Sequence, residues 1–287
     1  MNKSFYTYLS ALLLFGANGI IASLIDLNSL QIVLLRTLLG SLLLVALFFI
    51  SGGKPTFYKK KKQFAYLCIS GVAMGASWML LYEAYARIGV GIASLSYYCG
   101  PVIVMALSPL LFKEPLRANK VVGFAAVLAG VVLINGNAFD GSGDGFGIVC
   151  GLLSAVMYAC MVICNKKAAD IAGLENATLQ LLIAFLTTAV FVGVKQGYAM
   201  QITPQSILPV LLLGLLHTGI GCYLYFSSIG KLKVQTVALC GYVEPLSAVL
   251  FSMLFLKETM LPLQMIGAVL IIGGAMYGEL AKKRQPQ

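Results

Sequence analysis

The chain has 287 residues, of which 60% are hydrophobic and 10% are charged, and its formal net charge is +10. A soluble domain carries about a quarter charged residues, so this composition leaves too little polar surface for a water-exposed globule. Its continuous apolar runs, about 17–25 residues long, have the length of membrane-spanning helices and lack the alternation of barrel strands. The sequence therefore predicts an all-α polytopic membrane protein.

The apolar runs predict ten transmembrane helices. In chain order they cover residues 6–25, 30–50, 64–86, 91–112, 121–135, 147–164, 178–194, 207–229, 234–256 and 263–280. The first run is long enough to remain as a helix, and it lacks the small-residue cleavage site of a signal peptide.

The positive charges predict the orientation of these helices. With the N-terminus in the cytoplasm, sixteen lysine and arginine residues fall on the inner side, and three, Arg87, Lys195 and Lys257, fall on the outer side. Cytoplasmic loops carry an excess of Lys and Arg, so we expect both termini in the cytoplasm and the protein in the plasma (inner) membrane. The basic balance thus reflects membrane orientation, and we expect no nucleic-acid partner.

The second half of the chain repeats the first. A shift of 144 residues aligns the chain with itself without gaps, and identical pairs include Gly75 with Gly219, Leu80 with Leu224, Tyr98 with Tyr242, Pro101 with Pro245 and Glu114 with Glu258. This predicts two five-helix repeats, residues 1–140 and 141–287. Because five is odd, tandem repeats must insert with opposite topology, and such inverted repeats are typical of secondary transporters. A duplicated membrane protein that does not transport is the alternative.

Several short motifs occur along both halves. They are Leu-Phe-Gly-Ala-Asn at 14–18, Arg36, residues 98–101 and 111–114, Glu244 with Pro245, residues 256–259, and Gln264 with Gly267. Together they resemble the motifs of the EamA family of the drug/metabolite transporter superfamily. Two positions depart from that pattern: Phe15 stands where tryptophan is usual, and the seventh span, around residues 180–185, has no arginine to match Arg36. The resemblance implies ten helices around a central cavity and alternating access for metabolites, often in the direction of export.

Ionisable residues inside a membrane cost about 2.5–3.5 kcal/mol each on insertion scales, so each is a candidate for function. Glu244 lies near the middle of the span 234–256, directly before Pro245. It could bind a substrate ammonium group or take up a proton. Alternatively, Glu244 is part of the scaffold and bonds a backbone group that the proline leaves free. The sequence leaves both readings open.

Two basic candidates lie in other spans. Arg36, early in the second span, could pair with a substrate carboxylate, or it could have a structural role in which it snorkels outward or caps helix ends. His217, the single histidine, lies in the middle of the eighth span and could relay a proton. Hydrogen-bonded packing is the alternative for His217. No metal-ligand cluster accompanies either residue, so we expect no metal site.

Aromatic side chains form the remaining candidate group. Trp78 and Tyr82 lie one turn apart on one face of the third span, while Tyr98 and Tyr242 lie close to the two in-span prolines. An aromatic wall beside a carboxylate suits an amine-bearing or aromatic substrate. Helix packing is the alternative for each ring alone. Asn18, in the first span, either lines the cavity or bonds across helices.

Other polar and small residues predict structural contacts. Glu83 and Arg87 are four residues apart near the outer end of the third span and predict an ion pair. Glu114 and Glu258 lie in short loops, where we expect them to end the helices that precede them. Close helix packing is predicted at glycines spaced seven apart, which are Gly123, Gly130, Gly267 and Gly274.

No P-loop, nucleophile elbow or metal-ligand spacing occurs in the sequence, so we expect no enzyme, no cofactor and no ATP-driven transport by this chain. The prediction is a secondary active transporter that exports small organic metabolites, with amino acids or related amines favoured. Glu244 and His217 are the candidates for proton coupling. The alternatives are a proton-coupled antiporter of cationic or quaternary-ammonium drugs, and a non-transporting scaffold or sensor. We expect a small-molecule substrate and the lipid bilayer as partners of a monomer or homodimer.

Overall fold

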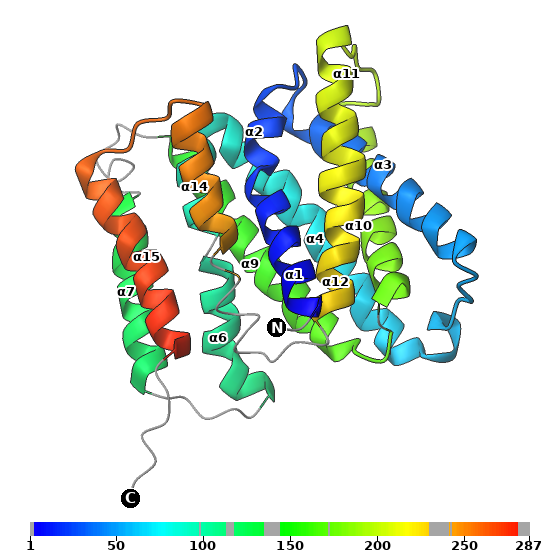
Figure 1. Ribbon diagram of the computed structural model, residues 1–287, viewed down its shortest axis with the longest axis horizontal. Helices are drawn as coiled ribbons and strands as arrows, with labels where there is room; N and C mark the ends of the chain where they lie inside the picture. Colours follow the sequence, from blue (N-terminus) through cyan, green and yellow to red (C-terminus); the bar gives the residue numbers. More distant parts are fainter. Residues whose placement is uncertain are drawn as a thin grey trace, which may run out of the picture.

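The computed structural model describes residues 3–97, 99–112, 118–134, 144–171, 173–229, 241 and 243–280, and all regular secondary structure in these ranges is helical (Figure 1). Six helical stretches there are long and apolar enough to cross a membrane: Ser4–Ser23, Ser29–Ile50, Lys61–Ile88, Gly145–Lys167, Gly173–Lys195 and Pro204–Ser228. Shorter apolar helices within the described residues overlap the other four predicted spans. The all-α prediction is confirmed, and the count of ten spans stays a prediction.

The helices of the first half are α1 (Lys3–Gly16), α2 (Asn18–Ser23), α3 (Ser29–Ile50), η1 (Phe57–Lys59), α4 (Lys61–Ile88), α5 (Val90–Tyr97), α6 (Cys99–Phe112) and α7 (Ala118–Ile134). Those of the second half are α9 (Gly145–Lys167), α10 (Gly173–Lys195), α11 (Pro204–Leu211), η2 (Leu212–Ile220), α12 (Gly221–Ile229), α14 (Val243–Phe255) and α15 (Pro262–Leu280). Local chemistry explains several of the boundaries. A capping box of Asn28 and Gln31 starts α3, and Pro204 occupies the first turn of α11.

Two predicted spans are not uniform α-helices. The first is interrupted at Ala17, whose N–H donates to Leu14 O over 3.1 Å, a three-residue step in place of the four-residue step of an α-helix. The eighth consists of α11, the π-helix η2 and α12 in succession. Hydropathy predicts the length of an apolar run but not a change from α-helical to another helical turn, because it depends only on which side chains are apolar.

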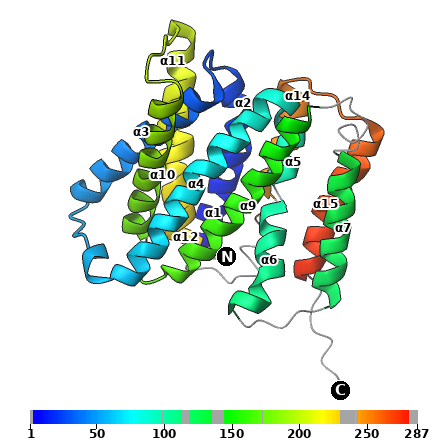
Figure 2. The same ribbon diagram turned by 180° about the vertical axis from the view of Figure 1, so that it is seen from behind.

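Figures 1 and 2 show how the helices are arranged. The pair α7 and α15 lies at one end of the molecule, α3, α10 and α11 lie at the other, and α4 and α9 run side by side between them. The surface suits hydrocarbon, because large apolar side chains that are 71–86% exposed point outward from several helices. They include Ile50, Leu110, Val194, Leu254 and Val269.

Helices at equivalent positions of the two halves pack antiparallel. In the pair α7 and α15, a Cβ at Gly130 would lie 2.6 Å from Gly267 O, and a Cβ at Gly274 would lie 2.9 Å from Gly123 O. Residue numbers rise along one helix as they fall along the other, so the two run in opposite directions. These are the four glycines for which close packing was predicted, and the close packing is confirmed.

The pair α3 and α10 repeats this arrangement. A Cβ at Gly40 would lie 2.9 Å from the Leu181 side chain, and the Thr178 hydroxyl lies 3.4 Å from Leu44 O. The numbers again run in opposite directions, so α3 and α10 are antiparallel. A shift of 144 residues relates the two helices, although their sequences match only weakly.

Glu258 closely follows the end of α14, where its N–H donates to Ser252 O over 3.3 Å, so the prediction that it ends this helix is confirmed. Its carboxylate crosses to the first half, where Oε1 accepts from Val90 N over 2.8 Å and Oε2 accepts from Gly91 N over 2.9 Å. Glu258 therefore caps α5, because the N–H groups of a first helical turn have no partner within their own helix. The same expectation for Glu114 lies outside the described residues.

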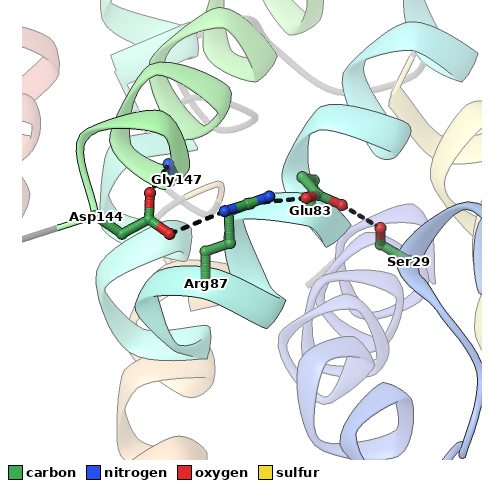
Figure 3. Close-up of polar contacts among 5 residues, drawn as sticks. All are labelled: Ser29, Glu83, Arg87, Asp144 and Gly147. Carbon is green, nitrogen blue, oxygen red and sulfur yellow. Dashed lines mark hydrogen bonds and ion pairs between the residues drawn. The ribbon is translucent and has the colours of Figure 1, made fainter.

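A polar network ties three helix ends together (Figure 3). Arg87 Nε donates to Glu83 over 2.7 Å, which confirms the predicted ion pair, and Arg87 Nη1 donates to Asp144 over 3.1 Å. Ser29, at the start of α3, donates to the other oxygen of Glu83. Asp144 caps α9 by accepting from Gly147 N over 3.0 Å. This backbone N–H and the Arg87 guanidinium hold the pKa of the Asp144 carboxyl below its usual value.

Candidate functional site

The site is centred on Arg36, whose side chain projects from α3 into the protein and is only 1% exposed. Its Nε donates to Thr218 Oγ1 over 2.8 Å, and its Nη1 donates to Tyr82 OH. The guanidinium carbon lies 4.2 Å from the ring centroid of Trp78 and 5.0 Å from that of Tyr82. The structure thus brings together three of the predicted residues, and Thr218 joins them as a residue that the sequence analysis missed.

Arg36 makes no salt bridge among those found in the described residues. Both of its hydrogen-bond acceptors are neutral hydroxyls, and the ion pairs found there belong to Arg87. Its Nη2 is buried and has no hydrogen-bond partner. A buried charged donor without an acceptor costs free energy, so this nitrogen is poised to receive an anionic or carbonyl oxygen.

The contact between Arg36 and Thr218 depends on a close approach of α3 to η2. A Cβ at Gly40 would lie 2.9 Å from Thr218 Cγ2 and 3.2 Å from Gly214 O. Glycine at position 40 therefore allows α3 and η2 to approach closely enough for the Arg36 guanidinium to reach the Thr218 hydroxyl. Short π-helical segments occur frequently at functional sites, and this one carries both His217 and Thr218.

His217 and Asn18 both lie at the interruption of the first helix. His217 Nδ1 lies 2.8 Å from Leu14 O, next to the break at Ala17. A carbonyl can only accept, so Nδ1 carries the proton and Nε2 is the acceptor in the neutral ring. Asn18 is buried at the start of α2, and its Oδ1 has no hydrogen-bond partner. Interrupted helices place free backbone groups at binding sites in many transporters.

Glu244 lies in the first turn of α14, which packs against α1, α2 and α5. The half-buried Glu244 interacts electrostatically with Tyr85, and Tyr85 also interacts with Arg36. Cys222 likewise interacts with both Glu244 and Arg36. Glu244, from the second half of the chain, and Arg36, from the first, thus both interact with Tyr85 and Cys222.

Two pairs of tyrosines interact with Arg36, with Glu244 or with both. Tyr82 and Tyr85 have ring centroids 5.2 Å apart, and Tyr97 packs edge-on against Tyr158 with centroids 5.1 Å apart. Tyr97 and Tyr158 also interact electrostatically with Glu244. The aromatic candidates Tyr98 and Tyr242 lie outside the described residues, so their predicted roles stay predictions.

Thr218 had a weak signal in the sequence. It is a hydroxyl residue in an apolar run, directly after the single histidine and between Gly214 and Gly219. Hydroxyls are common in membrane helices, where they usually bond their own backbone, so this signal alone does not select Thr218. Only its contact with a residue 182 positions away does so.

Comparison with known proteins places this architecture in a family. The sequence profile of the EamA-like transporter family matches residues 3–136 and again residues 145–277. The chain belongs to the EamA-like transporter family. The resemblance inferred from its motifs is therefore confirmed, and the chain is a multi-pass membrane protein with the two-repeat architecture of that family.

Curated EamA relatives align along most of their length. An uncharacterized transporter of Bacillus subtilis (strain 168), YxxF, is 25% identical over 275 residues, which cover 92% of this chain and 85% of the relative. The threonine/homoserine exporter RhtA of Salmonella typhimurium (strain LT2) is 27% identical over 255 residues, covering 88% and 82%. RhtA of Escherichia coli (strain K12) is 26% identical over 253 residues, with the same coverage. A solved crystal structure with 16% identity covers 98% of this chain and 99% of its own, with a TM-score of 0.69, and supports the fold alone.

Proposed function

We propose that this EamA protein is a secondary active transporter that exports small organic metabolites, with amino acids favoured, by alternating access around a central site. The observation that carries the proposal is the buried Arg36, whose Nη2 lacks a hydrogen-bond partner and whose other partners are neutral. A carboxylate supplies the missing acceptor, because Arg binds carboxylates through paired N–H···O bonds.

The other end of an amino acid needs a different partner. Glu244 and Arg36 both interact with Tyr85 and Tyr97, which supports a site where the carboxylate binds the ammonium group of a zwitterion and the guanidinium binds its carboxylate. The rings of Trp78 and Tyr82 supply apolar and cation–π surface beside them. Glu244 and His217 are the groups proposed to carry a coupling proton. The RhtA relatives, named as exporters of threonine and homoserine, support the choice of amino acids and of export.

Alternating access rests on the relation between the two halves. We propose ten spans in two inverted repeats, residues 1–140 and 141–287, in the inner membrane with both termini cytoplasmic. Antiparallel packing of α7 with α15 and of α3 with α10 supports inversion, because equivalent helices of inverted repeats must run in opposite directions. When the two halves exchange their local conformations, the site opens to the other side of the membrane.

The test is flux from proteoliposomes that contain purified protein. We expect efflux of L-threonine to exceed efflux of L-threonine amide, which lacks the carboxylate. We expect Arg36→Gln to reduce threonine transport about tenfold to a hundredfold with little effect on the amide, since a hydrogen bond to a charged group is worth about 1.5–3 kcal/mol. Arg87→Gln is the matched control, because it removes an exposed guanidinium from the network of Figure 3.

Two results would count against the proposal. Flux of a quaternary-ammonium probe that is unchanged by Arg36→Gln, without flux of amino acids, would indicate a cationic-drug antiporter. Absence of flux for the whole panel, in protein that remains folded, would indicate a scaffold or sensor. An imposed pH gradient in the same vesicles tests proton coupling.

A further inference from the structure

We infer that Thr218 is a positioning residue of the carboxylate site: it orients the Arg36 guanidinium so that Nη2 stays available to substrate. The inference rests on the proposed function, because it assigns the role of Thr218 within that same site. Thr218 belongs to the second half of the chain, whereas Arg36, Trp78 and Tyr82 belong to the first.

The Thr218 hydroxyl can only accept from Arg36, because its proton is committed elsewhere. Its Oγ1 donates to Leu213 O over 2.7 Å, five residues earlier in η2. A hydroxyl has one donor and two acceptor lone pairs, so both lone pairs remain for Arg36 Nε, which lies 2.8 Å away. The direction of the hydrogen bond is thereby determined by the backbone of η2.

The π-helical turn makes this arrangement possible. The hydroxyls of Thr37, Thr178, Thr187 and Thr188 each donate to the carbonyl four residues earlier, as is usual in α-helices. Thr218 instead reaches the carbonyl five residues earlier, within the wider turn of η2. The change of turn therefore moves the Thr218 hydroxyl away from the acceptor it would use in an α-helix.

Three contacts then set the orientation of the guanidinium plane. Thr218 holds Nε, Tyr82 holds Nη1, and the Trp78 ring lies under the group at 4.2 Å. With two of its nitrogens bonded and one face covered, Nη2 is the nitrogen left for a ligand. Loss of the Thr218 hydroxyl frees Nε and allows the plane to turn, which weakens carboxylate binding without removing the charge.

Trp78 offers a direct readout of the site. It is the only tryptophan in the chain, and the Arg36 guanidinium lies over its ring. Intrinsic fluorescence of the purified protein therefore reports events at Arg36 without a label. L-Threonine and L-threonine amide serve as the probes, titrated into the full-length protein in detergent and then compared in proteoliposome flux.

We expect Thr218→Val to raise the apparent Kd and the KM for threonine about tenfold, while the maximal rate and all values for the amide stay within about twofold. Thr218→Ser keeps the hydroxyl and should restore threonine binding. Thr188→Val is the matched control, since Thr188 is equally buried but bonds only its own helix, and it should bind both probes like the wild type.

Three outcomes would overturn the inference. The first is that Thr218→Val weakens binding of threonine and of its amide equally, and the second is that Thr218→Ser does not restore threonine binding. The third is that Thr218→Val binds threonine like the wild type while Arg36→Gln still loses the preference for threonine. The last result would leave the proposed function standing. If Arg36→Gln itself retains the preference, the proposed function fails instead. Gel filtration and the Ser variant distinguish misfolding from a specific loss of threonine binding.

Discussion

Two arginines of this chain have opposite environments, and the contrast indicates their roles. Arg87 is partly exposed and bonds two carboxylates, so its charge is locally compensated. Arg36 is buried, and its partners are two neutral hydroxyls and an aromatic face. A buried charge without a salt bridge is costly inside a membrane, which supports the proposal that Arg36 binds a charged substrate.

The network around Arg87 makes stability depend on pH through Asp144. The folded-state pKa of Asp144 is lowered, so its ionised form stabilises the folded protein above the unfolded-state pKa, and this contribution is lost as the pH falls through the lowered value. We expect the Tm of Asp144→Asn to fall less than that of the wild type between about pH 7 and about pH 3, because Asn still caps α9 but does not titrate.

Thermal melts in detergent across that pH range provide the measurement for Asp144. Asp26→Asn is the control, since Asp26 is an exposed carboxylate in the turn before α3, and its melts should follow the wild type. Identical pH profiles for Asp144→Asn and the wild type would contradict a stabilising role of the ionised carboxylate.

At the scale of elements, a hydrogen-bonded contact between the two halves determines where α5 begins. The cap on α5 comes from Glu258, 168 residues later in the chain. Lys257, just before it, has φ +54°, a left-handed conformation that is uncommon for a residue with a side chain. The turn thus adopts an unfavourable backbone conformation while it directs the Glu258 carboxylate to Val90 and Gly91.

Removal of this cap should weaken the attachment of α5 to the second half. We expect Glu258→Ala to lower the free energy of unfolding by about 1–2 kcal/mol, because it leaves two N–H groups of α5 without their charged acceptor. Lys257→Gly is the control, and it should not lower stability, since glycine adopts positive φ freely. Apparent Tm values in detergent check both, and a wild-type Tm for Glu258→Ala would show that the cap is dispensable.

At the scale of the whole molecule, the antiparallel pairs and the distribution of lysines suggest one orientation. Inverted halves must cross the membrane in opposite directions, and the lysine-rich turn before α4 then belongs on the cytoplasmic side. In the proposed orientation, the loop between α10 and α11 lies on the other side of the membrane, outside the cell.

Labelling of single cysteines tests this orientation in a variant whose seven native cysteines are replaced. We expect Gln201→Cys, in the loop before α11, to react with a membrane-impermeant maleimide on intact cells. Lys54→Cys, in the turn before α4, should react only after the cells are permeabilised. Both positions are exposed, so access rather than burial decides the result. The reverse pattern would mean that the termini lie outside.

The sequence alone determined the membrane class, the places of the apolar helices and the family, because hydropathy and motifs are properties of neighbouring residues. It also selected Arg36, Trp78 and Tyr82, since polar and aromatic groups are conspicuous in an apolar run. It could not select Thr218, or the helix that Glu258 caps, because each depends on a partner more than 160 positions away.

Only the tertiary structure decided which of these candidates meet. The packing of α3 against η2 brings Arg36 to its neutral acceptor, the Thr218 hydroxyl. The packing of α14 against α5 brings the Glu258 carboxylate to the N-terminus of α5. Such contacts follow from the close approach of backbones at glycines and from changes of helical turn. A change of helical turn leaves no periodic trace in the chain, so the surroundings of Arg36 had to be seen in three dimensions.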